Sequence, residues 1–404
     1  MELSMQVPEA AKEILEKLNR HGFEAYVVGG CVRDSLLHRT PGDWDITTSA
    51  RPEEVKAIFG HTIDTGLQHG TVTIMRERVG YEVTTYRIDG EYEDGRHPKA
   101  VEFTSNLLED LRRRDFTINA MAYNPKEGLV DAFEGIHDLR EKRIRCVGNA
   151  IERFTEDALR ILRAIRFSAQ LGFSIEESTW EAIRVIAPNL IHVSKERIQV
   201  ELTKLLLSEH PDEIKKVFER ELESRICDDF PKIAPDRISI NPALPVVKSV
   251  RWAAFLRHQT PEEAVAILRQ LKLDNDTVGR VKTLVQWWRR PIGASQTQIR
   301  RTMSAMTPDL YDDLLALKAS IAETELEAEG CAEDMDWLRL QTKEIRSRKD
   351  CVSLKELAVT GADLIQAGMK PGKELGETLK DMLELVLEHP EMNTREQLMS
   401  RKNP

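Results

Sequence analysis

Two aspartates separated by one residue are the strongest chemical signal in this sequence. Asp43 and Asp45 lie in the segment DWDIT. Alternate residues of a β-strand point to the same face, so we expect both carboxylates to converge if residues 43–47 form a strand. Clustered carboxylates repel each other unless a cation lies between them, and Mg²⁺ is usually held by one or two carboxylates together with substrate phosphates. An isolated pair of this kind is more often part of a solvated loop, so its interpretation depends on its neighbours.

A glycine pair precedes the two aspartates. Gly29 and Gly30 follow the apolar run from Ala25 to Val28 and lead into VRDSLL, which can open a helix. Because glycine has no Cβ, backbone N–H groups at such a turn can approach a phosphate closely. A glycine pair alone usually marks a turn, but its position between a strand and a helix, ahead of two acids, predicts a metal-dependent nucleotide site.

A third acid is expected to complete this site. Glu82 lies in the strand-like segment YEVTTYR, on the same face as Thr84 and Tyr86. Metal-dependent nucleotidyl transfer usually needs a further carboxylate to anchor an ion that also contacts the attacking hydroxyl. Taken alone, Glu82 would be read as an exposed strand residue, and it gains weight only from Asp43 and Asp45.

A cluster of arginines marks a second region of interest. The segment 112–125 reads RRRDFTINAMAYNP and contains Asp115 and Asn119. Arginine binds phosphate oxygens through a bidentate fork, and the two polar residues could bind a ribose hydroxyl. The alternative is an ordinary solvated basic turn.

The segment TEDALR, residues 155–160, offers a third possibility. Asp157 and Arg160 are three residues apart, so we expect them on one flank of a helix. The plainer interpretation is a salt bridge worth a few tenths of a kcal/mol. The chemical interpretation is a base reader, in which the carboxylate accepts from the amino group of cytosine or adenine and the guanidinium donates to the adjacent ring nitrogen. Guanine and uracil present the opposite pattern, and mismatched polar groups can give discrimination of about 10⁴ or more.

Composition and charge restrict the class of protein. The chain has 404 residues, enough for two to four domains, and its net charge of −10 argues against a generic nucleic-acid coat protein. Five scattered cysteines without zinc-ligand spacing predict reduced thiols in a cytosol. The sequence has no apolar run of membrane-spanning length and no secretory signal, so we expect a cytoplasmic protein.

One local basic stretch departs from the acidic average. Residues 278–301 contain no acid, and two tryptophans, Trp287 and Trp288, lie among the basic residues. Such a stretch fits phosphate contact with base stacking, but it equally fits a helix with a solvated basic face and a tryptophan in the core. The basic residues concerned are Arg280, Lys282, Arg289, Arg290, Arg300 and Arg301.

The elements that would position these residues fall into two classes. A helix is expected from Pro8 to near Gly22, and a shorter one from Pro52 to Phe59. Strands are expected at 24–28, 43–48, 71–77 and 81–87, which together predict an α/β or α+β head of about 140 residues. After Arg143 strand signals almost stop, and segment 223–250 has no clear periodicity. Helical spacing recurs at 151–170, 176–187, 196–208, 211–222, 261–272, 276–290, 308–325, 332–347, 354–369 and 374–388.

The motifs, in this order, resemble those of class II tRNA nucleotidyltransferases, the CCA-adding enzymes of the polymerase-β superfamily. The matching segments are GGCVRD, DWDIT, YEVTTYR, RRRDFTINAMAYNP, EDALRILRAIRFSAQLGF and KERIQVEL, and the last part of the chain resembles bacterial members without an HD domain. The resemblance implies an α+β fold, with a polymerase-β-like head of mixed sheet and helices followed by an all-helical neck, body and tail in a seahorse shape. We expect the head at 1–142, the neck at 143–220, the body at 221–292 and the tail at 293–404.

The resemblance also implies roles for individual residues. Asp43, Asp45 and Glu82 would be the catalytic acids and the ligands of Mg²⁺. Asp157 and Arg160 would read the base. Lys195, Glu196 and Arg197 match a helix-capping motif that braces the neck. Glu156 would help to hold Arg160. The nucleotide-binding residues would be Gly29, Gly30, Arg33, Arg114, Asp115, Asn119, Glu156, Asp157, Arg160, Arg163 and Arg166.

The implied activity is addition of CCA to the 3′ end of tRNA from CTP and ATP, with release of pyrophosphate and with the tail on the tRNA elbow. Residues 87–98 resemble the flexible loop of enzymes that add all three nucleotides. A specialised A-adding or CC-adding enzyme shares almost every motif, and a poly(A) polymerase is a weaker alternative. A non-catalytic RNA-binding protein would not need the acids. The resemblance is compatible with a homodimer and implies no membrane partner.

Overall fold

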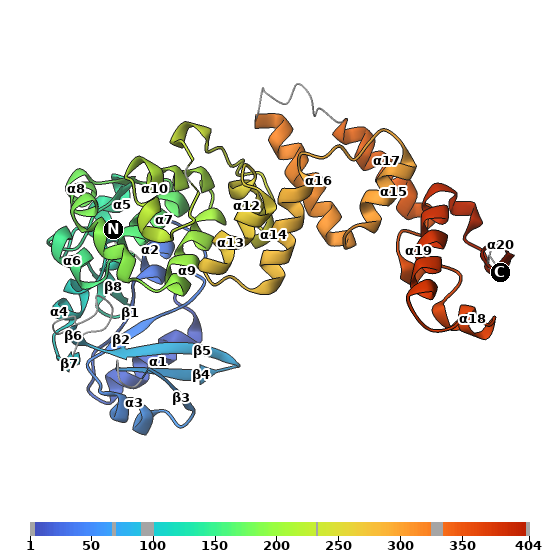
Figure 1. Cartoon of the computed structure of the whole chain (residues 1–404). Coiled ribbons are helices and arrows are strands. Elements are labelled where there is room, and N and C mark those ends of the chain that lie inside the picture. The colour runs from blue at the N-terminus through green and yellow to red at the C-terminus, as the bar shows by residue number, and fades with distance from the viewer. Residues whose placement is uncertain (1–4, 67–69, 90–100, 232, 325–333, 401–404) are drawn as a thin grey trace. The chain divides into compact units, whose positions relative to one another are not determined.

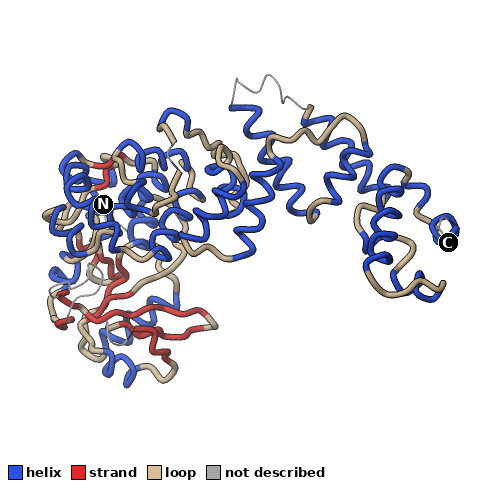
Figure 2. Tube along the Cα trace, in the orientation of Figure 1, coloured by secondary structure: helices blue, strands red, loops and turns tan. Residues whose placement is uncertain are grey.

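The computed structural model describes residues 5–66, 70–89, 101–231, 233–324 and 334–400. The chain divides into two compact units, Met1–Ile238 and Ser239–Pro404. Figure 1 labels their elements, and Figure 2 shows that the strands of the described residues lie in the first unit. The expected mixed sheet with helices, followed by a mostly helical remainder, is therefore confirmed.

The first unit is built on a seven-stranded sheet with the order β3-β4-β5-β2-β1-β8-β9. The β2–β5 pair is parallel, and all other neighbours in this sheet are antiparallel. Three of these strands, β3, β8 and β9, were not expected, because their sequences TIDTG, AYN and GLV contain too few apolar residues to show an alternation. The strands are β1 (Ala25–Val28), β2 (Ile46–Thr48), β3 (Thr62–Gly66), β4 (Thr71–Arg76), β5 (Val79–Thr85), β8 (Ala122–Asn124) and β9 (Gly128–Val130).

Short helices pack on this sheet. Helix α1 (Glu9–Arg20) buries an apolar stripe with helical spacing and contacts β1, and its N-cap is Pro8. Helix α3 begins at Pro52, which suits a first helical turn because its missing N–H would have no partner there, and the helix contacts β4. The remaining helices of this part are α2 (Gly30–Leu36), α3 (Pro52–Ile58), α4 (Leu107–Arg112) and α5 (Gly135–Arg140).

The rest of the first unit is mainly helical. Helix α7 is buried along most of its length and packs against α9, so these two helices form the centre of this part. Its helices are α6 (Ala150–Glu156), α7 (Leu159–Leu171), α8 (Glu177–Ile186), α9 (Lys195–Leu206), α10 (Lys215–Glu219) and α11 (Glu223–Ile226). Two short strand pairs accompany them, β6 (Arg87–Asp89) with β7 (Val101–Phe103) and β10 (Arg143–Ile144) with β11 (Ser174–Ile175).

The second unit consists of helices in its described residues. Helix α13 illustrates their sequence signals, because Thr260 and Glu263 form a capping box around Pro261 at the first helical position. The helices are α12 (Lys248–Leu256), α13 (Pro261–Gln270), α14 (Asn275–Trp287), α15 (Gln296–Ser304), α16 (Pro308–Thr324), α17 (Met335–Arg348), α18 (Gly361–Gln366), α19 (Lys373–Glu388) and α20 (Arg395–Ser400).

A buried arginine explains why part of segment 223–250 showed no periodicity. Arg251 of α12 is 1% exposed, and its guanidinium donates to the carbonyl oxygens of Pro242, Leu244 and Pro245 at 2.9, 2.7 and 3.1 Å. These carbonyls belong to an irregular loop, so their hydrogen bonds come from one side chain rather than from a regular ladder. Such a loop has no repeating pattern for sequence analysis to detect.

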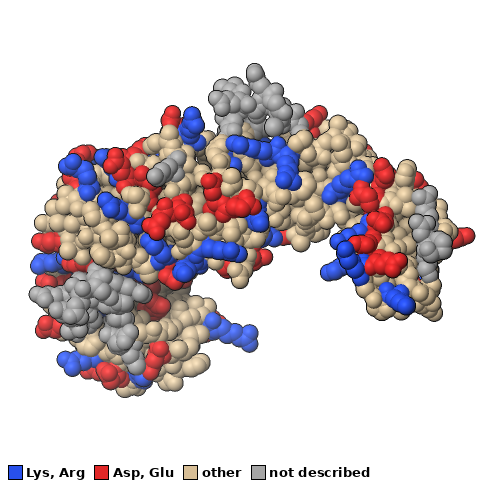
Figure 3. Space-filling view, viewed as in Figure 1, with Lys and Arg blue, Asp and Glu red and all other residues tan. Residues whose placement is uncertain are grey.

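The basic stretch 278–301 contributes largely to the packing of the second unit. Arg280 pairs with Asp309 and Asp313, at 2.6 and 2.7 Å. Arg300 is buried and donates to the carbonyl oxygen of Leu387 at 2.7 Å, so the expectation of a solvated basic surface is wrong for this residue. On the visible face of the second unit, acidic and basic side chains are interspersed (Figure 3).

Two expectations about compartment concern the described residues. Cys31, Cys146, Cys227 and Cys351 are free thiols, as predicted, and Cys331 lies outside the described part of the chain. None of the described helices combines the length and the apolar composition that a membrane span requires.

Candidate active site

The two aspartates precede a strand rather than lying within it. We expected residues 43–47 to be extended in the sheet, but β2 begins only at Ile46. The backbone still fixes Asp45, because its carbonyl oxygen accepts the N–H of Val28 at 3.0 Å, beside the end of β1. The carboxylates therefore lie on the segment that enters the sheet, directly opposite the end of the strand that leads to the glycine turn.

The register of the parallel pair brings Glu82 to the same place. Ile46 of β2 is paired with Val83 of β5, and both side chains are buried. The preceding residues are Asp45 and Glu82, so the alternation of a strand directs their side chains to the opposite, exposed face. The pairing of β2 with β5 thus explains why Asp45 and Glu82 lie near each other.

The electrostatic environment of Asp45 reflects this arrangement. Desolvation raises the pKa of the Asp45 carboxyl, the positive charge of Arg114 opposes the rise, and the negative charges of Glu82 and Asp43 add to it. Among the described residues, none of the three carboxylates has an ion-pair partner or a hydrogen bond to its side chain. In the same residues, no three acidic, histidine or cysteine side chains converge closely enough to hold a metal ion. The acids thus share one neighbourhood, and Arg114 compensates only part of their negative charge.

The predicted glycine turn lies beside these acids. Gly29 has φ = 81°, which a residue with a side chain rarely adopts, and a Cβ built on it would lie 3.0 Å from Nη1 of Arg114. Burial lowers the pKa of the Arg114 guanidinium, while Asp110 and Asp45 act in the opposite direction. The Nε atom of Arg114 is buried with no hydrogen-bond partner among the described residues. A cation is therefore held against a backbone turn that only glycine leaves open.

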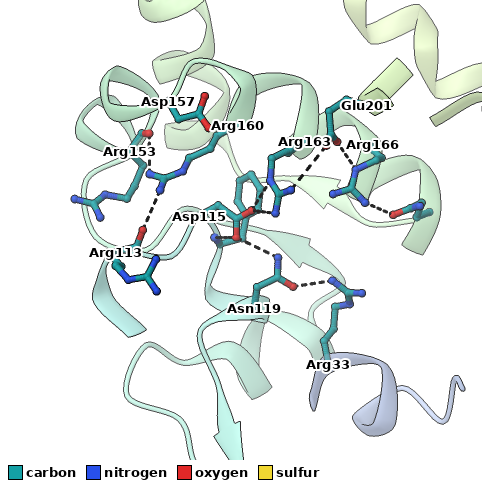
Figure 4. Close-up of polar contacts among 12 residues, drawn as sticks. Arg33, Arg113, Asp115, Asn119, Arg153, Asp157, Arg160, Arg163, Arg166 and Glu201 are labelled. Atoms are coloured by element: carbon teal, nitrogen blue, oxygen red, sulfur yellow. Dashed lines mark hydrogen bonds and ion pairs between the residues drawn. The ribbon is translucent and has the colours of Figure 1, made fainter. Parts of the chain in front are cut away.

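A chain of polar contacts runs from this turn into α7 (Figure 4). Arg33 of α2 donates from Nη1 to Oδ1 of Asn119 at 2.7 Å, and Nδ2 of Asn119 donates to Oδ1 of Asp115 at 3.1 Å. The other oxygen of Asp115 accepts from Nε and Nη2 of Arg163 at 2.8 and 2.6 Å. Burial would raise the pKa of the Asp115 carboxyl, but the charges of Arg163 and Arg160 outweigh it and hold the pKa far below its usual range.

The predicted nucleotide residue Arg166 is buried at the end of this chain. It donates from Nε to Glu201 at 2.5 Å and from Nη1 to Gln170 at 2.6 Å. Its guanidinium also lies 3.9 Å from the centre of the Phe167 ring. Glu201 is 5% exposed and lies 3.8 Å from Arg163 as well, so one carboxylate of α9 serves two arginines of α7. A nucleotide contact by Arg163 or Arg166 stays a prediction.

The segment TEDALR does not form one continuous helix. Helix α6 ends at Glu156, Asp157 is extended with φ = −148° and ψ = 101°, and α7 begins at Leu159. Asp157 and Arg160 therefore do not share a helix flank, and the expected salt bridge between them is replaced by two other pairs. Arg160 pairs with Glu156 at 2.6 Å, which is the contact that the resemblance implies, and Asp157 pairs with Arg197 at 2.6 Å.

Arg160 also contacts the backbone of the arginine cluster at residues 112–114. Its Nη2 donates to the carbonyl oxygen of Arg113, and its Nη1 to that of Arg153, both at 3.0 Å (Figure 4). Arg153 in turn donates to the carbonyl oxygen of Arg112 at 3.0 Å. Successive residues of the cluster thus accept from successive arginines of α6 and α7, which aligns segment 155–160 with Asp115.

Sequence analysis did not single out Glu201. The signal was present, because Glu201 lies between Ile198, Leu202 and Leu205 on the buried face of α9. A lone acid on an apolar helix face predicts a buried cationic partner, since a buried charge without a partner is very costly. The predicted flexible loop 87–98 lies outside the described residues from position 90 onward.

Comparison with known proteins agrees with this geometry. Residues 25–145 match the family model described as poly A polymerase head domain, residues 172–222 match the probable RNA and SrmB-binding site of polymerase A, and residues 247–401 match the putative tRNA nucleotidyltransferase domain 2. The CCA-adding enzyme of Latilactobacillus sakei is 40% identical over 412 residues, covering 99% of each chain. That of Lactococcus lactis is 38% identical and covers 94% of this chain and 92% of its own.

Solved structures give the same result. The Bacillus stearothermophilus CCA-adding enzyme in complex with CTP superposes with a TM-score of 0.82 at 32% identity, covering 98% of both chains. The Thermotoga maritima CCA-adding enzyme complexed with tRNA has a TM-score of 0.64 at 21% identity over 98% of this chain and 96% of its own, which supports the fold alone. By the extent and identity of these matches, this chain belongs to the CCA-adding enzymes, the nucleotidyltransferases of tRNA.

Proposed function

We propose that this chain completes the 3′ end of tRNA by adding CCA from CTP and ATP and releasing pyrophosphate. The observation that carries the proposal is the separate pairing of Asp157 and Arg160. A carboxylate and a guanidinium lie close in sequence, yet each is fixed by a different partner. The two side chains are therefore oriented independently of each other, Asp157 by Arg197 of α9 and Arg160 by Glu156 of α6.

The acids of the head suit a hard divalent cation. A nucleotidyltransferase of this type works with a divalent metal ion. The described carboxylates do not converge closely enough to hold an ion alone, so we propose that Asp43, Asp45 and Glu82 bind Mg²⁺ together with the phosphates of the nucleotide. Oxygen donors and negative charge that is only partly compensated match the preference of Mg²⁺ for carboxylates and phosphates. When bound, a pair of such ions would lower the pKa of the tRNA 3′-hydroxyl and neutralise charge on the triphosphate.

The chain itself supplies the cradle for the triphosphate. Gly29 leaves the turn open, and Arg114 is held beside it with an Nε that has no hydrogen-bond partner in the described part of the chain. Arg33 lies on the helix that follows the turn and is oriented by Asn119. Fixed cationic donors on both sides of an open backbone turn would bind phosphate oxygens and align the α-phosphorus for in-line attack.

Base selection would use the break between α6 and α7. Asp157 would accept from the amino group of cytosine or adenine, and Arg160 would donate to the neighbouring ring nitrogen. Guanine and uracil would place a carbonyl oxygen against a carboxylate and an N–H against a guanidinium. Both contacts would be repulsive, so the pair would reject these two bases.

The decisive experiment supplies the purified protein with Mg²⁺, CTP, ATP and tRNA lacking its 3′ end, followed by sequencing of the product termini. We expect termini that end in CCA. Products that stop at CC, or addition of A alone to tRNA ending in CC, would identify a specialised enzyme. Tracts of A would identify a poly(A) polymerase. Absence of pyrophosphate release would overturn the proposed activity in favour of a non-catalytic RNA-binding protein.

We also propose that the protein acts in the cytoplasm. Its described cysteines are free thiols, which suits a reducing compartment.

A further inference from the structure

Arg197 makes the closest contact to the proposed base-reading carboxylate. It lies in the first turn of α9 and donates from Nη1 to Oδ1 of Asp157 at 3.1 Å and from Nη2 to Oδ2 at 2.6 Å. Both side chains are mostly enclosed, with exposed fractions of 23% for Arg197 and 16% for Asp157. Next to it, Lys195 donates to the carbonyl oxygen of Ile226 at 2.5 Å. The turn that carries Arg197 is therefore held on a second side.

The contacts of Asp157 leave a single direction for a ligand. An ionised carboxylate has about four acceptor positions, two on each oxygen. Oδ1 accepts from Arg197 and also from the backbone N–H of Leu159 at 3.1 Å, whereas Oδ2 accepts from Arg197 alone among the described residues. One acceptor position thus stays open, and it is on Oδ2.

We propose that Arg197 is a positioning residue for nucleotide selection, which fixes the Asp157 carboxylate so that Oδ2 faces the amino group of the incoming base. The proposal rests on the proposed base-reading role of Asp157. A planar guanidinium that binds both oxygens fixes the plane of the carboxylate as well as its position, which a lysine ammonium does not. Arg197 and Asp157 are 40 residues apart in the sequence, so this contact depends on the packing of α9 near the start of α7.

Fixing the plane matters because rejection of a wrong base depends on repulsion. Uracil and guanine would place a carbonyl oxygen against Oδ2. A carboxylate that can rotate about its own side chain turns away from that oxygen and admits water, so the penalty for the wrong base falls. A clamped carboxylate cannot respond in this way, and the unpaired polar groups keep their full cost.

The same pair of helices offers a matched control. Glu201 lies one turn after Arg197 on α9, and it also forms an ion pair with α7, through Arg166. It has no contact with Asp157 among the described residues. Glu201→Gln therefore loosens the α7–α9 contact without releasing the carboxylate. A surface control is Arg184→Lys, because Arg184 is 71% exposed and pairs only with Glu181 in the described part of the chain.

The experiment compares the full-length protein with Arg197→Lys, Glu201→Gln and Arg184→Lys. Incorporation of one nucleotide into tRNA lacking its 3′ end is measured with Mg²⁺ and with CTP, UTP or a CTP analogue that lacks the 4-amino group. For Arg197→Lys we expect the ratio of kcat/KM for CTP over UTP to fall about tenfold or more, because the rejecting group is released. The penalty for the missing amino group should shrink in parallel.

The control variants separate the orientation of the Asp157 carboxylate from the general stability of the α7–α9 contact. Glu201→Gln should slow CTP and UTP alike and keep the ratio, and Arg184→Lys should change neither rate nor ratio. An unchanged ratio and analogue penalty in Arg197→Lys would overturn the proposal, and so would an equal loss of the ratio in Glu201→Gln. If the lysine variant melts early, Arg197→Gln replaces it. An unmodified protein that does not prefer CTP over UTP, or loses nothing with the analogue, would instead refute the base-reading function.

Discussion

The first unit contains two charged clusters, the head acids and the groups around α7, which differ in how far their negative charge is balanced by arginine. In the head, Asp43, Asp45 and Glu82 form no ion pair among the described residues, and the charge of Arg114 offsets only part of the rise in the pKa of Asp45. Around α7, the buried acids Asp115 and Glu201 are each paired with arginine, and the pKa of Asp115 is lowered. One cluster carries unbalanced charge, and the other is balanced by the protein itself.

This difference indicates which cluster needs a bound cation to neutralise its charge. Neutralising the head acids requires an added cation, so their charge can be used for metal and triphosphate binding. The groups around α7 are held in place by contacts already formed in the protein, so little reorganisation is needed when a base binds. We therefore expect substitutions in the head to affect chemistry more than folding, and substitutions around α7 to affect folding and selectivity.

The largest effect is expected for Asp43→Ala. Loss of a proposed metal ligand removes several kcal/mol of charge stabilisation, so incorporation of both CTP and ATP should fall by at least about a thousandfold. Binding of tRNA, measured by filter retention, should stay nearly intact. Asp64→Ala is the control, because Asp64 is an exposed head aspartate that pairs with Lys56. Surviving CTP addition in Asp43→Ala would refute the metal assignment.

A large effect on stability is expected for Asp115→Asn. The variant removes the charge of the buried Asp115, whose Oδ2 accepts two hydrogen bonds from the half-buried Arg163, and breaking such a pair costs up to roughly 3–5 kcal/mol. Calorimetric melting of the full chain should show the loss in the transition of the first unit. Asp212→Asn, which removes an exposed partner of Lys215, should leave melting nearly unchanged. Equal melting of both variants would mean that the Asp115 pair does not stabilise this part of the chain.

A smaller and more selective effect is expected for Arg160→Ala. Discrimination against UTP and GTP should fall by about a hundredfold, because the donor to the ring nitrogen is lost, while total turnover falls less. Competition assays with mixed nucleotides measure the ratio directly. Arg184→Ala provides a surface comparison on a neighbouring helix. Full rejection of UTP and GTP by Arg160→Ala would remove the base-reading role.

Local signals in the sequence predicted much of the head site. The apolar strand, the glycine turn and the DWD segment are consecutive, so their order could be read without a structure. The contacts of Asp157 and Arg300 could not be read in this way, because their partners Arg197 and Leu387 lie 40 and 87 residues further along the chain. Neither distance leaves a periodic trace in the sequence.

The break at Asp157 shows the same limit. Residues 151–170 have helical spacing throughout, and nothing in them excludes one helix. The Asp157 side chain accepts the N–H of Leu159, the first residue of α7, and pairs with Arg197 of α9 at the same time. These contacts stabilise an extended residue inside a helical pattern. The residue types of this segment indicate its chemistry, but the geometry that separates Asp157 from Arg160 depends on contacts distant in sequence.

The smallest expected effect concerns Asp45→Asn and acidity. Because folding raises the pKa of Asp45, its ionised form disfavours the folded state above that pKa, and the penalty disappears as the pH falls. The variant should therefore melt slightly above the unmodified protein at neutral pH without metal, and the gap should close on acidification. Added Mg²⁺ should raise the melting temperature of the unmodified protein only.

The comparison with Asp115→Asn fixes the sign of this effect. A lowered pKa means that ionised Asp115 stabilises the fold at neutral pH, and this contribution is lost as the pH falls through the folded pKa. Asp115→Asn should thus melt below the unmodified protein where Asp45→Asn melts above it. Melting curves between neutral and acidic pH, with and without Mg²⁺, measure both differences. If both variants melted lower, and Mg²⁺ stabilised Asp45→Asn as well, the head acids would be balanced within the protein and the contrast between the two clusters would be wrong.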